Sequence, residues 1–509
     1  MMPGLKGNAG WTLADLLAGL VEPVGLPPLA VTGLAMDSRA MVPGGLFLAC
    51  VGTRAHGMTY AAAAVRHGAA AVLAEPDAEW PPARLAAQAG ALGVPIIPVP
   101  ELGRLASHLA ARFHGEPARQ LRMLGVTGTN GKTSVTQFLA QALAPAWRCG
   151  VLGTVGYGFP GDLQAASHTT PDPVRLQELL AELHDAGARA VAMEVSSHAL
   201  HQHRVGAVPF DTAVFTNLSR DHLDYHGSMA AYADAKAQLF RQPGLRLAVL
   251  NTDDAMGLRL ADELRGRVTV VACGRTDATS AHAAHYVHLH NVKVGPDGLA
   301  FDFDSSWGPG SVRTPLLGEF NAENLSLVLG VLLAWDMAPA QAAQRLAALM
   351  PVPGRMQTFG GSGRPLVVVD YAHTPDALAK VLNSLRAHTR GRLVCVFGCG
   401  GDRDRGKRPD MGALAERLAD RVLLTDDNPR SEDGDAIVAA IRAGMARPEA
   451  ALVERNRAAA IRRAIAEAGP DDLILVAGKG HEDYQLVGDL RLPFSDAEQV
   501  RLALTEGGA

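Results

Sequence analysis

The chain of 509 residues has few of the features that mark secreted or membrane proteins. Its five cysteines are odd in number and include no C-x-x-C pair, which argues against a disulfide framework and predicts reduced thiols. No apolar run approaches the roughly 18 residues that a membrane-spanning helix requires. The first residues, M-M-P-G-L-K-G-N-A-G-W, lack the apolar core of a signal peptide. We therefore expect a cytoplasmic protein.

Aromatic residues and net charge are also scarce. Aromatics make up 5% of the chain, and the formal net charge is −5. The sequence thus lacks the excess of basic residues that nucleic-acid binding usually requires, and we expect no such partner. A hydrophobic content of 48% is sufficient for buried cores. At about 150 residues per domain, the length predicts two to four domains.

Short apolar runs that end in polar or glycine-rich residues recur along the middle and last parts of the chain. Examples are R-M-L-G-V, A-V-A-M-E, T-A-V-F, L-V-V-V-D, L-V-C-V-F and L-I-L-V-A-G. Continuous apolar runs of this length are typical of strands buried on both faces in parallel sheets. The sequence therefore predicts an α/β fold whose segments meet at 114–119 and 350–355. Ligands of such sheets bind beyond the carboxyl ends of the strands, where these polar residues fall.

The stretch L-G-V-T-G-T-N-G-K-T-S at 124–134 predicts a phosphate-binding loop with altered spacing. The standard pattern has a glycine where this chain has Val126. An apolar run precedes the loop and a helical pattern follows it, so backbone N–H groups and the helix N-terminus can face a phosphate. Lys132 can reach the outer phosphates, and the Thr133 hydroxyl can bind Mg²⁺. A glycine-rich turn without a ligand is the less favoured alternative.

Acids and histidines that follow the next two apolar runs are candidate metal ligands. Glu194 ends one run, where an acid can hold Mg²⁺; a capping or surface role is the alternative. His222, in N-L-S-R-D-H-L-D-Y-H-G, is a candidate second ligand, whereas His226 is better interpreted as structural. From composition, Lys236 in A-Y-A-D-A-K-A-Q-L-F is an ordinary exposed helical lysine.

Three further motifs indicate small-molecule binding. Asn321 and Asn324 are three residues apart and share one face at a helix start, where capping and adenine recognition are equally compatible with Asn321. Arginines beside Gly and Pro in 399–408 and 425–430 suit bidentate capture of carboxylates. Asp427 and Glu482 can hold an ammonium group. These loops favour a zwitterionic amino-acid ligand over purely solvated surface.

The motifs together resemble the Mur ligase family of peptidoglycan synthesis. The resemblance rests on G-T-N-G-K-T, M-D-S-R, T-T-P-D, M-E-V-S-S-H-A-L, P-G-R-M, D-Y-A-H-T-P, D-D-N-P-R and G-K-G-H-E, which span nearly the whole chain. It implies three domains. They are an N-terminal α/β domain for the UDP end (1–116), a central P-loop ATPase-like domain (117–352) and a C-terminal Rossmann-like domain for the amino acid (353–509).

The resemblance also implies an activity. ATP would phosphorylate the D-glutamate γ-carboxylate of UDP-N-acetylmuramoyl-L-alanyl-D-glutamate, and the amine of meso-diaminopimelate would attack the acyl phosphate. D-D-N-P-R is the form associated with diaminopimelate, whose additional carboxylate Arg430 can meet. The resemblance implies Mg²⁺ as the cofactor and ATP as the co-substrate. It also implies a monomer in the cytoplasm that has no nucleic-acid or membrane partner. The product would serve cell-wall synthesis, cell shape and division.

Carried over by motif, the resemblance assigns residues to groups. The ATP-binding group is Gly128, Thr129, Asn130, Gly131, Lys132, Thr133, Ser134, Asn321, Asn324, Asp370 and His373. The group for the UDP-muramoyl dipeptide is Met36, Ser38, Thr53, Arg54, Ala55, Thr169, Thr170, Ser196, Gln202 and Arg204. The diaminopimelate group is Arg403, Asp427, Asn428, Pro429, Arg430, Gly478 and Glu482. The catalytic group is Lys132, Glu194, His222, Arg355 and a carbamylated Lys236; the metal ligands are Thr133, Glu194, His222 and the Lys236 carbamate.

One departure and two alternatives accompany the resemblance. Gln357 follows P-G-R-M where relatives often have Glu, which leaves a local hinge contact open. Arg355 lies just past the second joint, so domain closure would bring it to the γ-phosphate. The alternatives are a ligase that adds L-lysine or acts on folate, and a P-loop ATPase or GTPase switch that makes no covalent product. D-D-N-P-R and the N-terminal segment argue against the first, and the paired arginine and acid loops against the second.

Overall fold

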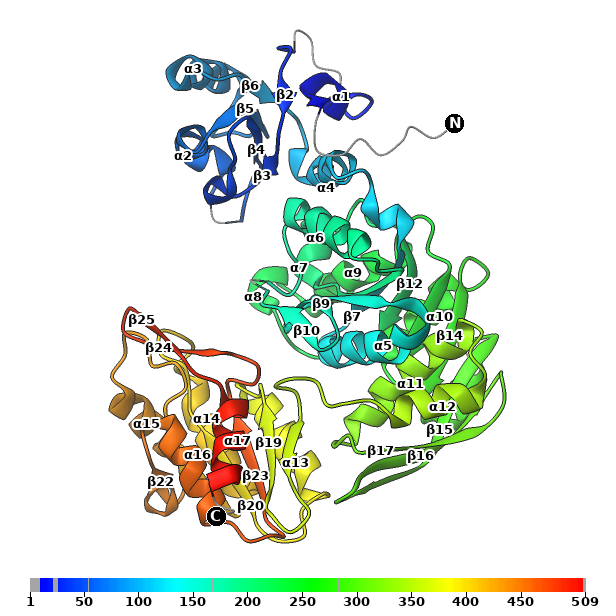
Figure 1. The fold of residues 1–509 in the computed structure, drawn as a ribbon, viewed down its shortest axis with the longest axis vertical. Coiled ribbons are helices and arrows are strands. Elements are labelled where there is room, and N and C mark those ends of the chain that lie inside the picture. Colours follow the sequence, from blue (N-terminus) through cyan, green and yellow to red (C-terminus); the bar gives the residue numbers. More distant parts are fainter. Residues whose placement is uncertain (1–9, 22–25, 54, 167, 282, 507–509) are drawn as a thin grey trace. The chain divides into compact units, whose positions relative to one another are not determined.

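The computed structural model describes residues 10–21, 26–53, 55–166, 168–281 and 283–506 (Figure 1). The chain divides into two compact units, Met1–Ala272 with Ala281–His285, and Cys273–Ser280 with Tyr286–Ala509. Among the described residues, no helix is both long and apolar enough to span a bilayer. Cys50, Cys149, Cys273, Cys395 and Cys399 are all free and buried, as predicted for reduced thiols.

The first unit begins with a small parallel sheet. Its strand order is β3-β4-β5-β6, with bounds Leu34–Ala35, Gly45–Ala49, Ala69–Ala74 and Ile96–Pro98. Helices α1 to α4 span Leu13–Leu17, Ala61–Arg66, Pro82–Leu92 and Leu102–Phe113, and a two-stranded pair is formed by β1 (Trp11–Thr12) and β2 (Ala30–Val31). β4 and β5 are almost wholly apolar and bury both faces, one in each of two hydrophobic clusters.

A larger sheet follows in the same unit. Its order there is β10-β9-β8-β11-β7-β12-β13-β14, with bounds Asp162–Gln164, Gly156–Phe159, Cys149–Gly153, Ala190–Glu194, Arg122–Thr127, Phe210–Phe215, Leu247–Asn251 and Thr269–Gly274. The last residues of β14, Cys273 and Gly274, belong to the other unit. The strands β8, β11, β7, β12 and β13 run parallel, whereas β9 and β10 are antiparallel additions. Its helices, α5 to α10, span Lys132–Trp147, Pro173–Asp185, Ser197–His201, Leu223–His226, Met229–Ala237 and Ala255–Leu264.

The register of this sheet brings the polar strand ends together. Glu194 at the end of β11 pairs with Val126 of β7, and Thr127 pairs with Phe215 at the end of β12. The phosphate-loop segment, Glu194 and the segment after Phe215 therefore leave one edge of the sheet side by side. This is the edge at which parallel sheets bind ligands.

The second unit begins with antiparallel strands and two helices. Strands β15 to β17 span His285–Gly295, Gly298–Ser305 and Gly310–Thr314, the first residue of β15 belonging to the other unit. Helix α11 spans Phe320–Ala334 and α12 spans Pro339–Ala347. Most of α11 is buried, which explains why its sequence N-L-S-L-V-L-G-V-L-L-A is apolar on every side.

The C-terminal sheet has the order β18-β19-β23-β20-β21-β22, and all of it is parallel except β18. These strands span Gln357–Gly360, Leu366–Asp370, Leu473–Ala477, Leu393–Phe397, Arg421–Leu424 and Leu452–Val453, and a separate hairpin is formed by β24 (Tyr484–Val487) and β25 (Leu490–Pro493). Helices α13 (Pro375–Arg386), α14 (Lys407–Leu418) and α15 (Gly434–Arg442) cover one face, and α16 (Arg457–Ala466) and α17 (Asp496–Glu506) cover the other. The predicted α/β class with parallel sheets is thus confirmed.

A fully buried ion pair joins the two helices on the second face. Arg457 Nε and Nη2 donate to the Asp496 carboxylate at 2.7 and 2.8 Å, and neither side chain is exposed. Arg457 Nη2 also donates to the Ala477 carbonyl at 2.9 Å, so the guanidinium fixes the end of β23. A charge buried this deeply depends on its partner.

We predict that Asp496→Ala lowers the free energy of unfolding of this domain by about 3–5 kcal/mol, because it leaves the Arg457 charge buried without the carboxylate that is hydrogen-bonded to it. Urea denaturation followed by circular dichroism measures the change. Arg463→Ala is the control, since the Arg463–Glu467 pair is 41% and 36% exposed and is expected to contribute no more than about 1 kcal/mol. Equal effects of the two substitutions would contradict the assignment.

Candidate active site

The loop between β7 and α5 has the backbone that its glycines predict. Gly128 has a φ of 149° and Gly131, just before α5, has a φ of 84°, conformations that favour glycine. A Cβ built on Gly128 would lie 1.9 Å from Thr216 Oγ1, so a side chain is excluded sterically as well. The spacing with Val126 is therefore compatible with a tight turn into the helix, and Val126 itself is a buried strand residue.

The segment that follows β12 holds this loop in place. Thr129 N donates to the Asn217 carbonyl at 2.8 Å, and Asn130 N donates to Asn217 Oδ1 at 3.0 Å. Thr216 Oγ1 donates to the Asn130 carbonyl at 2.6 Å. Hydrogen bonds within the protein thus fix the loop, and the N-terminus of a 16-residue helix lies directly after it.

Glu194 and Thr133 meet at the start of α5. Thr133 Oγ1 donates to Glu194 Oε2 at 3.0 Å. Thr154 donates to the same carboxylate twice, from its N to Oε1 at 2.7 Å and from its Oγ1 to Oε2 at 3.1 Å. Glu194 is only 2% exposed, so the capping or surface-charge alternative does not describe it. The hydroxyl and carboxylate oxygens are the hard ligands that Mg²⁺ prefers.

Lys236 is not the exposed helical lysine that composition indicates. It is 1% exposed, and its Nζ donates to the Gly128 carbonyl at 2.7 Å. Lys132 Nζ donates to the same carbonyl at 3.0 Å, so two amines share one acceptor. Burial, followed by the charge of Lys132, lowers the pKa of Lys236 well below its ordinary value of 10.5. The site therefore favours a neutral, nucleophilic amine at this position.

His222 lies among other histidines and a tyrosine. The centroids of the His222 and His198 rings are 4.9 Å apart, and His222 Nε2 is 3.5 Å from Asp221 Oδ2. Burial is the main cause of the lowered pKa of His222, which keeps the imidazole neutral and able to bind a metal. His226 Nε2 is 2.9 Å from Ser197 Oγ, in agreement with its structural interpretation. Burial also lowers the pKa of His198 to about 4; sequence reasoning missed this residue, although it lies inside M-E-V-S-S-H.

No group of three or more His, Cys, Asp or Glu side chains among the described residues is arranged to hold a metal by itself. Mg²⁺ commonly binds through one or two carboxylates, waters and substrate phosphates. The Thr133–Glu194 pair fits that mode, and His222, a nitrogen ligand, is a less usual partner for so hard an ion.

The residues assigned to the muramoyl dipeptide form one hydrogen-bond network. Thr170 Oγ1 donates to the Glu194 carbonyl at 2.9 Å and accepts from Ser196 N at 3.1 Å. Arg204 donates to the Thr170 carbonyl at 2.9 Å and to Gln202 Oε1 at 2.6 Å. Thr169 joins through its Oγ1, which lies 3.0 Å from Thr154 Oγ1 and can donate to it. The network begins at the Glu194 carbonyl, so the five assigned residues are connected to the Thr133–Glu194 pair.

The residues assigned to the UDP end lie beyond the carboxyl ends of β3 and β4. Met36 and Ser38 follow β3; Ser38 is 8% exposed, and its carbonyl is 2.7 Å from His67 Nδ1. Thr53 and Ala55 follow β4 and are exposed, and Arg54 lies outside the described residues. Because β3 and β4 are parallel neighbours, the two groups share one edge of the small sheet.

In the second unit, the two asparagines assigned to ATP are buried at the start of α11. Asn324 Nδ2 donates to Asn321 Oδ1 at 2.9 Å, and Asn321 Nδ2 donates to the Leu317 carbonyl at 2.7 Å. Asn321 therefore does not cap the helix, because its amide bonds a carbonyl that precedes it. Adenine recognition by these residues stays a prediction.

The assigned residues near the second joint are held by Asp370 at the end of β19. Its Oδ2 accepts from Met356 N at 2.8 Å and its Oδ1 from Ala372 N at 2.8 Å. The guanidinium of Arg355 lies 4.8 Å from the Tyr371 ring centroid, and its buried Nε has no hydrogen-bond partner in the described part of the chain. His373 follows, its Nδ1 2.8 Å from the Tyr371 carbonyl. An unsatisfied arginine donor is compatible with an anionic ligand.

Gln357, the departure from the family pattern, keeps a local contact. Its Oε1 accepts from Gly354 N at 2.9 Å. An oxygen of Glu would accept the same bond, so the amide replaces the carboxylate at this hinge without loss of the acceptor.

The residues assigned to diaminopimelate converge beyond β21 and β23. Asn428 and Pro429 are buried, and Asn428 Nδ2 donates to Glu482 Oε2 at 2.9 Å. Gly478 has a φ of 117°, and a Cβ there would lie 2.4 Å from Asp427 Oδ2. Arg430 Nη1 donates to the Gly401 carbonyl at 2.8 Å, whereas the side chain of Arg403 reaches only its neighbour's carbonyl, at 3.4 Å.

Two further pocket residues were missed from sequence. Lys479 Nζ donates to Glu482 Oε2 at 2.9 Å and to Asn428 Oδ1 at 3.1 Å. Gln485 Nε2 donates to the Asp427 carbonyl at 2.8 Å. The only sequence signal for Lys479 is its place in G-K-G-H-E.

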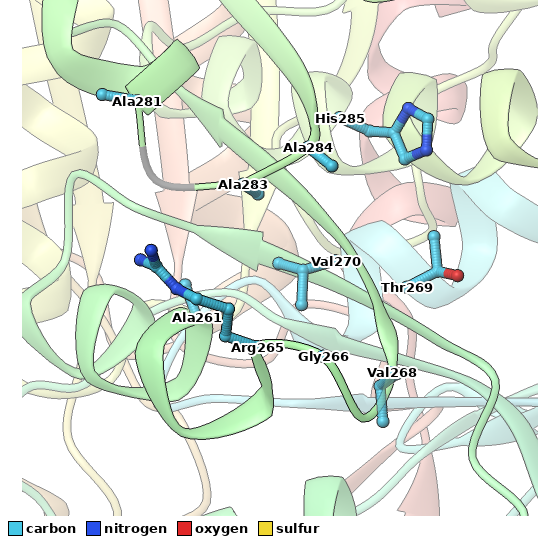
Figure 2. Close-up of a pocket in the computed structure, with 10 residues that line it drawn as sticks. All are labelled: Ala261, Arg265, Gly266, Val268, Thr269, Val270, Ala281, Ala283, Ala284 and His285. Atoms are coloured by element: carbon cyan, nitrogen blue, oxygen red, sulfur yellow. The ribbon is translucent and has the colours of Figure 1, made fainter.

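A groove of about 350 Å³ lies elsewhere in the first unit, between the end of α10, the start of β14 and residues 281 and 283–285 (Figure 2). Its walls are mainly small or apolar, with Arg265, Thr269 and His285 as the polar contributors. None of the predicted site residues lines it, so it is separate from the candidate site.

Family models match most of the chain. "Mur ligase family, catalytic domain" matches residues 30–114, "Mur ligase middle domain" matches 126–332, and "Mur ligase, glutamate ligase domain" matches 354–480. With curated relatives that are about half identical over more than nine-tenths of its length, the chain belongs to the Mur ligase family.

These relatives carry one name. The UDP-N-acetylmuramoyl-L-alanyl-D-glutamate–2,6-diaminopimelate ligase of Alkalilimnicola ehrlichii is 52% identical over 480 residues, 94% of this chain and 95% of that protein. The protein of the same name from Pseudomonas aeruginosa is 51% identical over 479 residues, 94% and 95% of the two chains. A solved structure with this name has a TM-score of 0.69 at 35% identity, covering 98% and 99%. The fold is shared with Mycobacterium tuberculosis folylpolyglutamate synthase, which is 21% identical and has a TM-score of 0.59. That match covers 74% of this chain and 92% of the synthase.

We predict that Gly128→Ala weakens ADP binding at least about tenfold, or about 1.4 kcal/mol, because its Cβ would collide with Thr216 and displace the loop. Isothermal titration calorimetry with ADP measures the affinity. Gly90→Ala on α3 is the control, since a Cβ there meets nothing within 4 Å. Unchanged affinity in the Gly128 variant would show that the loop does not bind the nucleotide.

Proposed function

We propose that the chain is an ATP-dependent amide ligase that joins meso-diaminopimelate to the D-glutamate of UDP-N-acetylmuramoyl-L-alanyl-D-glutamate. The observation that carries the proposal is the acceptor pocket, where D-D-N-P-R lies against Lys479 and Glu482 in a chain that is 52% identical to a ligase of that name. The product would supply peptidoglycan synthesis, and thereby cell shape and division. We place the enzyme in the cytoplasm as a monomer, with domains 1–116, 117–352 and 353–509 for the UDP end, ATP and the amino acid.

The proposed reaction has two steps. A γ-carboxylate oxygen of the D-glutamate attacks the γ-phosphorus of ATP, forming an acyl phosphate and releasing ADP. The neutral amine of diaminopimelate then attacks the acyl carbon and the C–N bond forms. The acyl C–O bond breaks, inorganic phosphate leaves with that oxygen, and the nitrogen gives up one proton. The protein contributes chiefly position and positive charge, as is general for phosphoryl transfer.

The residues of the first unit fit the first step. The loop 128–134 presents backbone N–H groups to the phosphates, and Lys132, which already donates to two loop carbonyls, can turn to a phosphate oxygen. Bound Mg²⁺ would neutralise charge on the phosphates, and Thr133 and Glu194 are the residues that would hold it, with His222 as a further candidate. Thr170, Ser196 and Arg204, hydrogen-bonded beside Glu194, would orient the dipeptide.

Lys236 fits a carbamate. A neutral amine adds to CO₂, an N–C bond forms and a proton leaves to solvent, which turns a potential cation into an anion. At this site two amines share the Gly128 carbonyl, so a carbamate on Lys236 would place an anion beside the Lys132 ammonium, and the two would attract each other. The carbamate oxygens would then serve as further metal ligands.

Lys236→Ala is expected to lose most ligase activity, because the buried anion is lost. Added bicarbonate and short-chain carboxylic acids partly restore it if they occupy the vacated space. ADP release at saturating substrates is the measurement, and Lys293→Ala, at an exposed lysine of β15, is the matched control. Wild-type activity in Lys236→Ala would refute the carbamate.

An amino-acid panel in the same ADP-release assay tests the proposed function. We expect diaminopimelate to be preferred over L-lysine by at least about a hundredfold in kcat/KM, since lysine lacks the carboxylate that Arg430 would meet and leaves that site's polar groups unpaired. Preference for lysine would contradict the acceptor. Hydrolysis of ATP without any amine acceptor would favour a nucleotide switch instead.

A further inference from the structure

Lys479 is the buried centre of the acceptor pocket. It follows β23, and none of its side chain is exposed. Its ammonium donates to Glu482 Oε2 at 2.9 Å and to Asn428 Oδ1 at 3.1 Å, and lies 5.4 Å from the Tyr484 ring centroid. A buried ammonium is tolerated only with partners of this kind. By contrast, Lys380 at the surface of the same domain pairs with Asp376 while its side chain is 52% exposed, so water also solvates its charge.

The ammonium settles the orientation of Asn428. Asn428 Oδ1 accepts from both Lys479 Nζ and Leu486 N, the latter at 2.9 Å, so it must be the oxygen. The amide nitrogen is then directed at Glu482 Oε2. Without Lys479, only the Leu486 N–H would remain as a donor to Asn428 Oδ1, and the amide would be held less firmly in this orientation.

Glu482 is left with one oxygen for a ligand. Both protein donors, Asn428 Nδ2 and Lys479 Nζ, bind Oε2. Among the described residues no hydrogen bond reaches Oε1, and the side chain is 17% exposed. The pair of Lys479 and Glu482 has no net charge, which suits an acceptor whose own charges cancel.

We propose that Lys479 is a positioning and specificity-determining residue, whose ammonium fixes Asn428 and balances Glu482 so that Glu482 Oε1 receives one ammonium group of a zwitterionic acceptor. The inference rests on the proposed function, since it takes diaminopimelate as that acceptor. Diaminopimelate has two ammonium and two carboxylate groups, whereas L-lysine has one carboxylate fewer and a net positive charge. Removal of the Lys479 charge takes the hydrogen-bonded ammonium away from Glu482 and makes the pocket more negative, which favours the cationic amino acid.

Steady-state kinetics of Lys479→Met test the proposal. We expect the KM for diaminopimelate to rise about tenfold or more, from the loss of one partner of a buried charge pair, while the KM values for ATP and the UDP-linked dipeptide stay within about twofold. The ratio of kcat/KM for L-lysine to that for diaminopimelate should rise about tenfold. Lys479→Arg keeps the charge and should keep the wild-type ratio, even if its affinity falls. Lys380→Met, on the exposed face of α13, is the control.

An unchanged KM for diaminopimelate in folded Lys479→Met would overturn the proposal. A lower kcat with all three KM values and the ratio of kcat/KM for L-lysine to that for diaminopimelate unchanged would also overturn it, because that result is expected of a merely structural residue. If Lys479→Met does not fold, the double variant Lys479→Met with Glu482→Gln, which removes both charges of the pair, is tested in place of the single variant. The double variant should fold and lose discrimination between the two amino acids; retained discrimination would overturn the proposal. Wild-type enzyme that turns over no diaminopimelate would instead contradict the proposed function itself.

Discussion

The buried carboxylate of Glu194 is the interaction on which the candidate active site depends. It accepts hydrogen bonds from Thr133 at the start of α5 and from Thr154 after β8, while its backbone carbonyl accepts from Thr170. One residue at the end of β11 thus joins the phosphate loop to the segment assigned to the dipeptide. A buried carboxylate is costly unless all its acceptors are used or a cation binds it. Glu194 and the Thr133 hydroxyl are therefore suited to hold a cation.

In both units, polar candidate site residues lie at the carboxyl ends of parallel strands. In the first, Glu194, the loop 128–131 and Thr216 leave the carboxyl edge of a parallel sheet. In the second, Asp427 and Gly478 leave the corresponding edge of the C-terminal sheet. Apolar strands bury both faces, and the polar groups are concentrated where the strands end. One edge is suited to phosphates and a metal, and the other to an amino acid with paired charges.

The sequence was sufficient for the parts that depend on local pattern. Continuous apolar runs predicted buried parallel strands, and Gly128 and Gly131 predicted a turn that only glycine adopts easily. Glu194 was found because it ends a strand next to that loop. The α/β class and the family follow from these features, whereas the role of each assigned residue stays a prediction.

The parts that sequence missed depend on contacts between distant segments. Lys236 has the sequence of an exposed helix, yet it meets the Gly128 carbonyl 108 residues away. Lys479 meets Asn428 across 51 residues, and no periodicity or charge run indicates that contact. The burial of Lys236 and Lys479 could not be inferred from secondary-structure propensity. A buried amine is stable only with a hydrogen-bond or charge partner, and tertiary structure brings that partner from a distant segment.

The most direct test of the central claim, that ATP activates a carboxylate for amide formation, is an isotope-transfer measurement. The UDP-linked dipeptide labelled with ¹⁸O in its D-glutamate γ-carboxylate is incubated with ATP and diaminopimelate, and the released phosphate is analysed by mass spectrometry. The account predicts phosphate that contains ¹⁸O from the substrate, since the attacking carboxylate oxygen leaves with phosphorus. Phosphate whose new oxygen comes only from water would contradict it.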